Sequence, residues 1–143
     1  MLRNIDSVVS PELLDVLFRM GHGDEIVLAD AFFPGDSCNS RVIRADGIDV
    51  SRLLAGICPL ITLDSYVDNP LVMMQPGEGD SLDEEVEADF MKAVHQTWPE
   101  AAGPARIGRF EFYERARNAF AVVMSGEVRK YGNIIIKKGV INR

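Results

Sequence analysis

The 143-residue sequence has few cysteines and no long apolar run, which argues against two classes of protein. Its two cysteines, Cys38 and Cys58, have no metal-binding or redox spacing, so each is expected to be a small core residue in a reduced, cytoplasmic protein. No apolar segment approaches the roughly 18 residues of a membrane span. The first residues lack the apolar segment of a secretory signal. We therefore expect no membrane association.

Basic residues are also scarce. Lysine and arginine number 15 against 22 aspartates and glutamates, which gives a net charge of −7. Because nucleic-acid binding requires a basic face, no nucleic-acid partner is expected. Apolar residues make up 47% of the chain and charged residues 26%, as in ordinary globular proteins. This length and composition predict a single domain over residues 1–143.

The apolar pattern predicts alternating helices and short strands. Ser10 and Pro11 are typical of a helix start, and apolar residues at helical spacing follow up to residue 20. The uninterrupted apolar run 26–29 predicts a strand that is covered on both faces, and 31–40 resembles a loop. Further strands are expected at 41–44, 60–63, 71–74, 120–124 and 133–137, helices at 50–58 and after a capping box at 81–84, and an extended or helical segment at 109–116. Together these elements predict an α/β fold with a mixed sheet.

His22 lies between Gly21 and Gly23, after the first helix and before the strand at 26–29. The flanking glycines allow a sharp turn that leaves the imidazole uncovered, and α/β folds place their sites in loops at sheet edges. His22 is therefore either a catalytic acid or base, or a residue that only caps or turns the chain. The other histidine, His95, lies off the apolar stripe of its helix and is expected to be a solvated surface residue.

Other polar residues stand at the ends of predicted strands. Asp30 could orient a sugar hydroxyl or accept its proton, it could orient the histidine, or it could cap the following loop. The phenol and amide of Tyr131-Gly132-Asn133 suit a sugar ring, although by themselves they are better explained as a simple turn before the strand. Arg109 is a further polar residue at the edge of an apolar segment. One histidine among carboxylates lacks the spacing of a metal site, so no metal is expected.

Nine short segments carry a family resemblance. They are 10–14 (SPELL), 20–26 (MGHGDEI), 30–31 (DA), 42–47 (VIRADG), 63–66 (LDSY), 71–74 (LVMM), 109–110 (RF), 112–116 (FYERA) and 130–134 (KYGNI). In order and spacing, from about residue 1 to residue 140, the chain resembles the family of L-fucose mutarotases and D-ribose pyranases. It is more similar to the fucose branch, chiefly at 20–26 and 112–116.

The resemblance implies a three-layer α/β/α fold and a cytoplasmic enzyme that interconverts the anomers of a monosaccharide, most closely L-fucose, without cofactor or metal. It implies His22 as the proton donor and a set of substrate-binding residues: Asp30, Arg109, Tyr131, Gly132 and Asn133. It also implies a homo-oligomer, with a ring-shaped decamer expected.

Two alternatives stay open: a D-ribose pyranase that exchanges pyranose and furanose forms, and a noncatalytic monosaccharide-binding protein of the same fold. Phe32 stands where related fucose mutarotases often carry histidine, which leaves the choice of sugar open. Near the C-terminus, 134–136 is either an interface segment or a central buried strand. Val140 and Ile141 are the better interface candidates.

Overall fold

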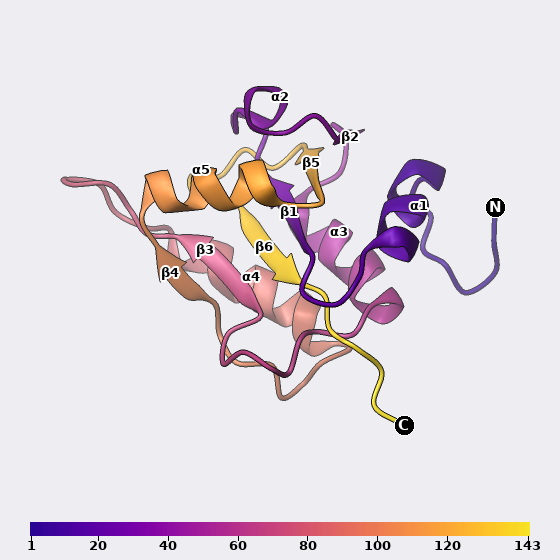
Figure 1. The fold of residues 1–143 in the computed structure, drawn as a ribbon. Coiled ribbons are helices and arrows are strands. Elements are labelled where there is room, and N and C mark those ends of the chain that lie inside the picture. The colour runs from indigo at the N-terminus through magenta and orange to yellow at the C-terminus, as the bar shows by residue number, and fades with distance from the viewer.

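A six-stranded mixed sheet lies between two layers of helices in the computed structural model, which describes all 143 residues (Figure 1). The strands are β1 (Glu25–Ala29), β2 (Val42–Ala45), β3 (Leu71–Met74), β4 (Ala105–Ile107), β5 (Ala121–Ser125) and β6 (Ile134–Lys137). The helices are α1 (Pro11–Arg19), α2 (Gly35–Cys38), α3 (Val50–Ile57), α4 (Glu84–His95) and α5 (Arg109–Asn118), with a 3₁₀ turn η1 (Cys58–Leu60). The strand order is β2-β5-β1-β6-β3-β4, and only β6 runs antiparallel to its neighbours. The expected three-layer fold with a mixed sheet is confirmed.

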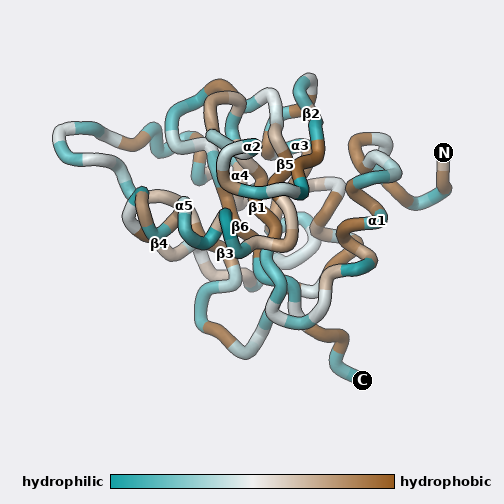
Figure 2. Tube along the Cα trace, turned by 45° about the horizontal axis from the view of Figure 1, so that its top comes forward, coloured by the Kyte–Doolittle hydropathy of each residue, from teal (hydrophilic) through white to brown (hydrophobic).

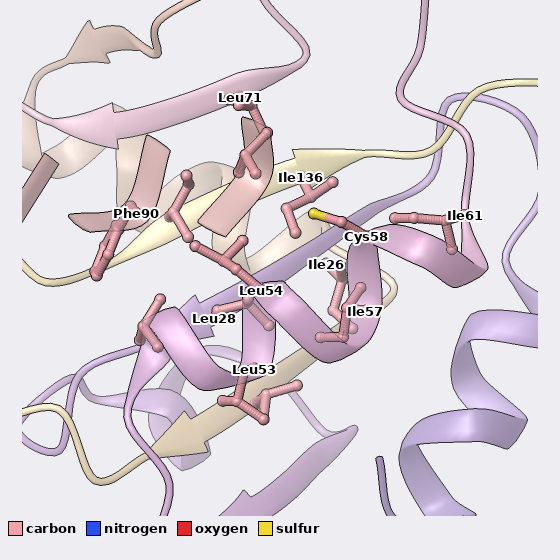
Figure 3. Close-up of a cluster of buried hydrophobic side chains, with 14 of the residues drawn as sticks. Ile26, Leu28, Leu53, Leu54, Ile57, Cys58, Ile61, Leu71, Phe90 and Ile136 are labelled. Carbon is pink, nitrogen blue, oxygen red and sulfur yellow. The ribbon is translucent and has the colours of Figure 1, made fainter. Parts of the chain in front are cut away.

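Each face of the sheet has its own core, because successive strand residues point to opposite sides. Ile26 and Leu28 of β1 pack with α1, α3 and α4, whereas Val27 lies on the other face with α5. Figure 3 shows the first core, where apolar side chains of α3 lie against the strands and the side chain of Cys58 lies near Ile136. Apolar residues concentrate in the central strands, and the connecting loops are largely hydrophilic (Figure 2). No helix has both the length and the apolar character to cross a membrane.

Local sequence signals explain the element ends. The Ser10 hydroxyl accepts the N–H of Leu13 at 3.1 Å, which caps α1 as expected. Helix α4 begins later than the predicted capping box: Asp83, not Ser81, is its N-cap, and its carboxylate accepts the N–H of Glu85 at 3.0 Å. A carboxylate at this position also interacts favourably with the positive end of the helix dipole.

Two sequence predictions about elements are wrong, and one strand was not predicted. The strand predicted at 60–63 is absent, because α3 continues into η1 and only Leu63 forms an isolated bridge, with Lys138. The segment 31–40 contains the short helix α2. The three-residue strand β4 carries too short an apolar pattern to be predicted.

The C-terminal apolar segments differ in burial. Ile134, Ile135 and Ile136 are fully buried in β6, which lies between β1 and β3. The buried-strand alternative therefore holds for these three residues. Ile141 is exposed and Val140 is at the edge of exposure, so both remain available for contact with another molecule.

Candidate functional site

A cleft of about 280 Å³ opens at the carboxyl end of β1, a volume at the small end of ligand pockets. Four predicted site residues line it: Asp30, Arg109, Tyr131 and Asn133. Gly132 lies between the last two. The cleft is completed by Phe32, Phe33, Pro34, Met74, Asp80, Tyr113 and Lys130. The fold thus brings together residues from β1, the start of α5 and the turn before β6 that are up to 103 positions apart.

Asp30 and Asn133 are locked together at the buried side of the cleft. The backbone N–H of Asp30 donates to Oδ1 of Asn133 at 2.7 Å, and Nδ2 of Asn133 donates to Oδ2 of Asp30 at 3.0 Å. Burial raises the pKa of the Asp30 carboxyl, and the nearby charge of Glu127 raises it further. The hydrogen bonds from the N–H of Phe32 and from the Asn133 amide lower this pKa, but the effect of burial is larger. Asp30 is therefore a fixed carboxyl that holds a proton more readily than an ordinary aspartate.

Replacing Asn133 by aspartate tests this pair, because the shape is kept while a second carboxyl faces Asp30. Two carboxyls at this distance cannot both ionise, so one pKa rises further. A carboxyl whose pKa is raised by folding stabilises the protein while protonated, and that stability is lost as the pH rises through the raised pKa. We expect Asn133→Asp to melt close to wild type at about pH 4 and to lose about 1–3 kcal/mol of unfolding free energy at neutral pH. Thermal denaturation across this range measures it, and equal destabilisation at both ends would contradict the paired geometry.

Tyr131 connects the cleft to the loop between β3 and α4. Its hydroxyl donates to Oδ2 of Asp80 at 2.9 Å and accepts the N–H of Gly77 at 3.0 Å. Lys130 adds an ion pair with Asp80 at 3.2 Å. The N–H of Ser81, followed by the Tyr131 hydroxyl and Lys130, lowers the pKa of the Asp80 carboxyl. Tyr131 is thus held in a fixed position at the wall of the cleft.

Gly132 follows Tyr131 in a tightly packed turn. A Cβ atom at this position would lie 2.7 Å from Cγ of Glu127 and 2.9 Å from the carbonyl oxygen of Arg129. No larger residue fits without movement of the backbone that carries Tyr131 and Asn133. The role of Gly132 in the site is therefore close packing.

Arg109 begins α5 on the opposite wall. Its Nε donates to the hydroxyl of Tyr113 at 3.1 Å, and its guanidinium carbon lies 5.3 Å from the centre of the Tyr113 ring. Arg109 is exposed, and its terminal nitrogens bond no other protein group. The cleft therefore presents a cation, a carboxyl, an amide and a phenol beside apolar surface, a combination suited to a small polyhydroxylated ligand.

His22 does not line the cleft of its own chain. It precedes β1 whereas Asp30 follows it, and the five-residue strand separates its ends by roughly 16 Å. The possibility that Asp30 orients the histidine is therefore wrong within one chain. Nε2 of His22 lies 3.1 Å from Oδ1 of Asp64, and the imidazole packs at 5.0 Å against the ring of Tyr66. His95 is exposed as expected, with Nε2 3.0 Å from the carbonyl oxygen of Ala101.

Several residues of these two regions have no role in the sequence predictions. Asp64 and Tyr66 lie in the segment 63–66, and Lys130 in the segment 130–134, both part of the family resemblance. Asp80 lies in an acidic loop whose composition indicates only solvent exposure. Their side-chain partners are at least 42 positions away, so local sequence carries no signal of these side-chain contacts.

Other reactive groups lie outside any site. Cys58 is fully buried, and burial raises the pKa of its thiol to about 12, which confirms it as a core residue. Cys38 is half-buried and packs against the second core. No cluster of three or more histidine, cysteine, aspartate or glutamate side chains is arranged to hold a metal ion.

The fold and the cleft indicate the class of protein: a small α/β/α domain whose cleft has the size and the polar groups to hold a monosaccharide. The chain belongs to the RbsD / FucU transport protein family, whose model matches residues 3–141.

An L-fucose mutarotase of Haemophilus influenzae (strain ATCC 51907 / DSM 11121 / KW20 / Rd) is 55% identical over 140 residues, 98% of this chain and 97% of the relative. An L-fucose mutarotase of Histophilus somni (strain 129Pt) is 52% identical over the same shares. The crystal structure of the fucose mutarotase from Streptococcus pneumoniae in complex with L-fucose is similar, with a TM-score of 0.86, 40% identity and coverage of 99% and 100% of the two chains.

Proposed function

We propose that the protein is an L-fucose mutarotase, an isomerase that interconverts the α and β anomers of the sugar. Its main support is the cleft, where the locked Asp30–Asn133 pair faces Arg109 and Tyr131. Similarity over 98% of the chain to proteins named L-fucose mutarotase supports the choice of sugar. The apolar side of the cleft, with Phe32, Phe33, Pro34 and Met74, suits the methyl group of a 6-deoxy sugar.

Catalysis of anomer exchange requires only an acid and a base that move protons. A base takes the proton of the anomeric hydroxyl, a C=O bond forms at C1, the bond from C1 to the ring oxygen breaks, and an acid protonates that oxygen. Closure on the other face of the carbonyl reverses these steps. General acid and base groups in place each contribute on the order of 10²–10⁴-fold. No carbon–hydrogen bond breaks, so we propose a reaction without cofactor or metal.

Each polar group of the site has a place in this reaction. His22 is the proton donor, and Asp30 binds the hydroxyl that loses its proton. Asn133 holds Asp30 in position through two hydrogen bonds. Arg109 stabilises negative charge that develops on a sugar oxygen, and Tyr131 offers its ring to the apolar face of the sugar.

His22 and the cleft can act on one sugar only if they come from neighbouring copies of the chain. Exposed apolar side chains mark both regions, and each is 73–81% exposed. Phe32 lines the cleft and Phe110 lies beside Arg109, while Tyr66 packs against His22 and Ile141 follows Lys138, whose carbonyl accepts the N–H of Gly23. Contact between these two different surfaces is heterologous, and such contacts form a ring when the rotation between copies closes. We therefore propose a homo-oligomer in which His22 of one copy completes the cleft of the next.

The proposal also covers the number of copies in the oligomer and the cellular compartment of the protein. Two stacked rings of about five copies form the decamer that the family resemblance implies. The two free thiols are consistent with a reducing compartment, the cytoplasm.

Saturation-transfer NMR on the two anomers of L-fucose tests the activity. We expect saturation of one anomeric proton to reduce the signal of the other in the presence of enzyme, and to do so less for L-galactose, which has a hydroxyl where fucose has only the methyl group. L-Rhamnose and D-ribose complete the panel. Exchange at the buffer rate with L-fucose would overturn the proposal, and bound fucose without exchange would indicate the noncatalytic alternative. Faster pyranose–furanose exchange with D-ribose would indicate the pyranase.

A further inference from the structure

Asp64 is a buried carboxylate whose side chain is 4% exposed, while that of its partner His22 is 44% exposed. Oδ1 of Asp64 accepts the N–H of Tyr66 at 3.1 Å and lies 3.1 Å from Nε2 of His22. Burial would raise the pKa of the Asp64 carboxyl, yet the Tyr66 N–H and the imidazole together lower it. Asp64 is thus ionised at neutral pH and can only accept hydrogen bonds.

The end of β6 holds Asp64 and His22 in a fixed relation. The N–H of Gly23 donates to the carbonyl of Lys138 at 2.8 Å, and the N–H of Asp64 donates to the carbonyl of Lys137 at 3.0 Å. Gly139 packs so closely that a Cβ there would lie 2.7 Å from Cα of Asp64. Three segments distant in sequence are therefore joined by backbone contacts at this point, and the contact between Asp64 and His22 is built into the fold.

We propose that Asp64 is a positioning residue that selects the reactive nitrogen of His22. Because the carboxylate can only accept hydrogen bonds, the neutral imidazole must carry its proton on Nε2, the nitrogen that faces Asp64. Nδ1 then remains unprotonated, has no partner within the protomer and belongs to the half-exposed side chain. In the protonated ring the proton that leaves is the one on Nδ1, while Nε2–H stays bonded to Asp64.

This inference rests on the proposed function, in which His22 is the proton donor to the sugar. Asp64 does not touch the sugar; it turns the imidazole so that the same nitrogen gives the proton to the ring oxygen and takes it back on ring closure. Tyr66 packs against the ring and limits its rotation. Loss of such an orienting partner typically reduces activity by about 10–100-fold.

Magic-angle-spinning NMR of the sedimented protein, with ¹⁵N-labelled histidine, measures the tautomer directly. The chain has only two histidines, so the variant His95→Gln leaves a single labelled imidazole. At about pH 8.5, where an imidazole is neutral, we expect wild-type His22 to carry its proton on Nε2. A His22 ring protonated on Nδ1 would overturn the inference, whatever happens to any variant.

Both contacts use Oδ1 of Asp64, so the variant Asp64→Asn turns either its amide oxygen or its NH₂ group toward Tyr66 and the imidazole, and it no longer fixes which ring nitrogen is protonated. We expect a mixture of tautomers and an exchange rate at saturating fucose that is about 10–100-fold lower, with an unchanged half-saturating concentration. Asp68→Asn, a change of an exposed residue in the same loop, should alter neither. An unchanged tautomer and rate in Asp64→Asn would overturn the inference. A wild-type protein with the expected tautomer but no fucose exchange would instead contradict the proposed function.

Discussion

In the variant His22→Ala, the rate of anomer exchange is expected to fall by a factor on the order of 10²–10⁴, while the fold is kept. His22 lies in an exposed turn, and its side chain bonds only Asp64, so its removal leaves no gap in either core. Fucose should still bind, because Asp30, Arg109 and Asn133 remain in the cleft. Saturation-transfer NMR measures the exchange rate, and far-ultraviolet circular dichroism with a melting curve monitors the fold.

His95→Ala is the matched control, since His95 is the only other imidazole and lies exposed on α4. Its exchange rate should equal that of the wild type. Wild-type exchange in a folded His22→Ala protein would show that another group supplies the proton.

The variant Ile141→Asp is expected to dissociate the oligomer and to abolish exchange with it. Ile141 is exposed, follows Lys138, whose carbonyl accepts the N–H of Gly23, and does not line the cleft, so the change leaves the sugar-binding groups of its own chain in place. Losing a buried isoleucine side chain weakens each contact by about 1.5–3 kcal/mol, and burial of the new carboxylate adds to the cost. Light scattering combined with the exchange assay measures both effects.

Asn142→Asp introduces the same charge one residue later, in place of a polar side chain, and serves as the control. It should retain the assembly and most of the activity. An Ile141→Asp monomer that exchanges fucose at the wild-type rate would disprove a site shared between copies.

The fold could be predicted from the sequence wherever one short signal determines one element. The run 26–29 is apolar throughout because β1 is central in the sheet and covered on both faces, and Ser10-Pro11 starts α1 by local hydrogen bonding. The strand predicted at 60–63 fails for the opposite reason. Its apolar residues are buried against the first core without a neighbouring strand, and periodicity does not distinguish these two environments.

The site could be predicted only in part, because its contacts join distant positions. Asp30 and Asn133 were identifiable as polar residues next to apolar strands, yet their mutual hydrogen bonds require the pairing of β1 with β6. The Asp64–His22 contact depends on the backbone after β6, far from both residues in sequence. The separation of His22 from the cleft follows from the length of β1, whose two ends carry His22 and Asp30.

Mixed oligomers test most directly the central claim that His22 of one copy serves the cleft of another. Co-expression of His22→Ala and Arg109→Ala chains with different tags yields hybrids, purified through both tags in turn. Each variant alone should be nearly inactive. In a hybrid with random order, about one quarter of the sites combine an intact cleft with an intact histidine, so activity should recover to about a quarter of the wild-type rate. A hybrid no more active than the two separate variants would contradict the shared site.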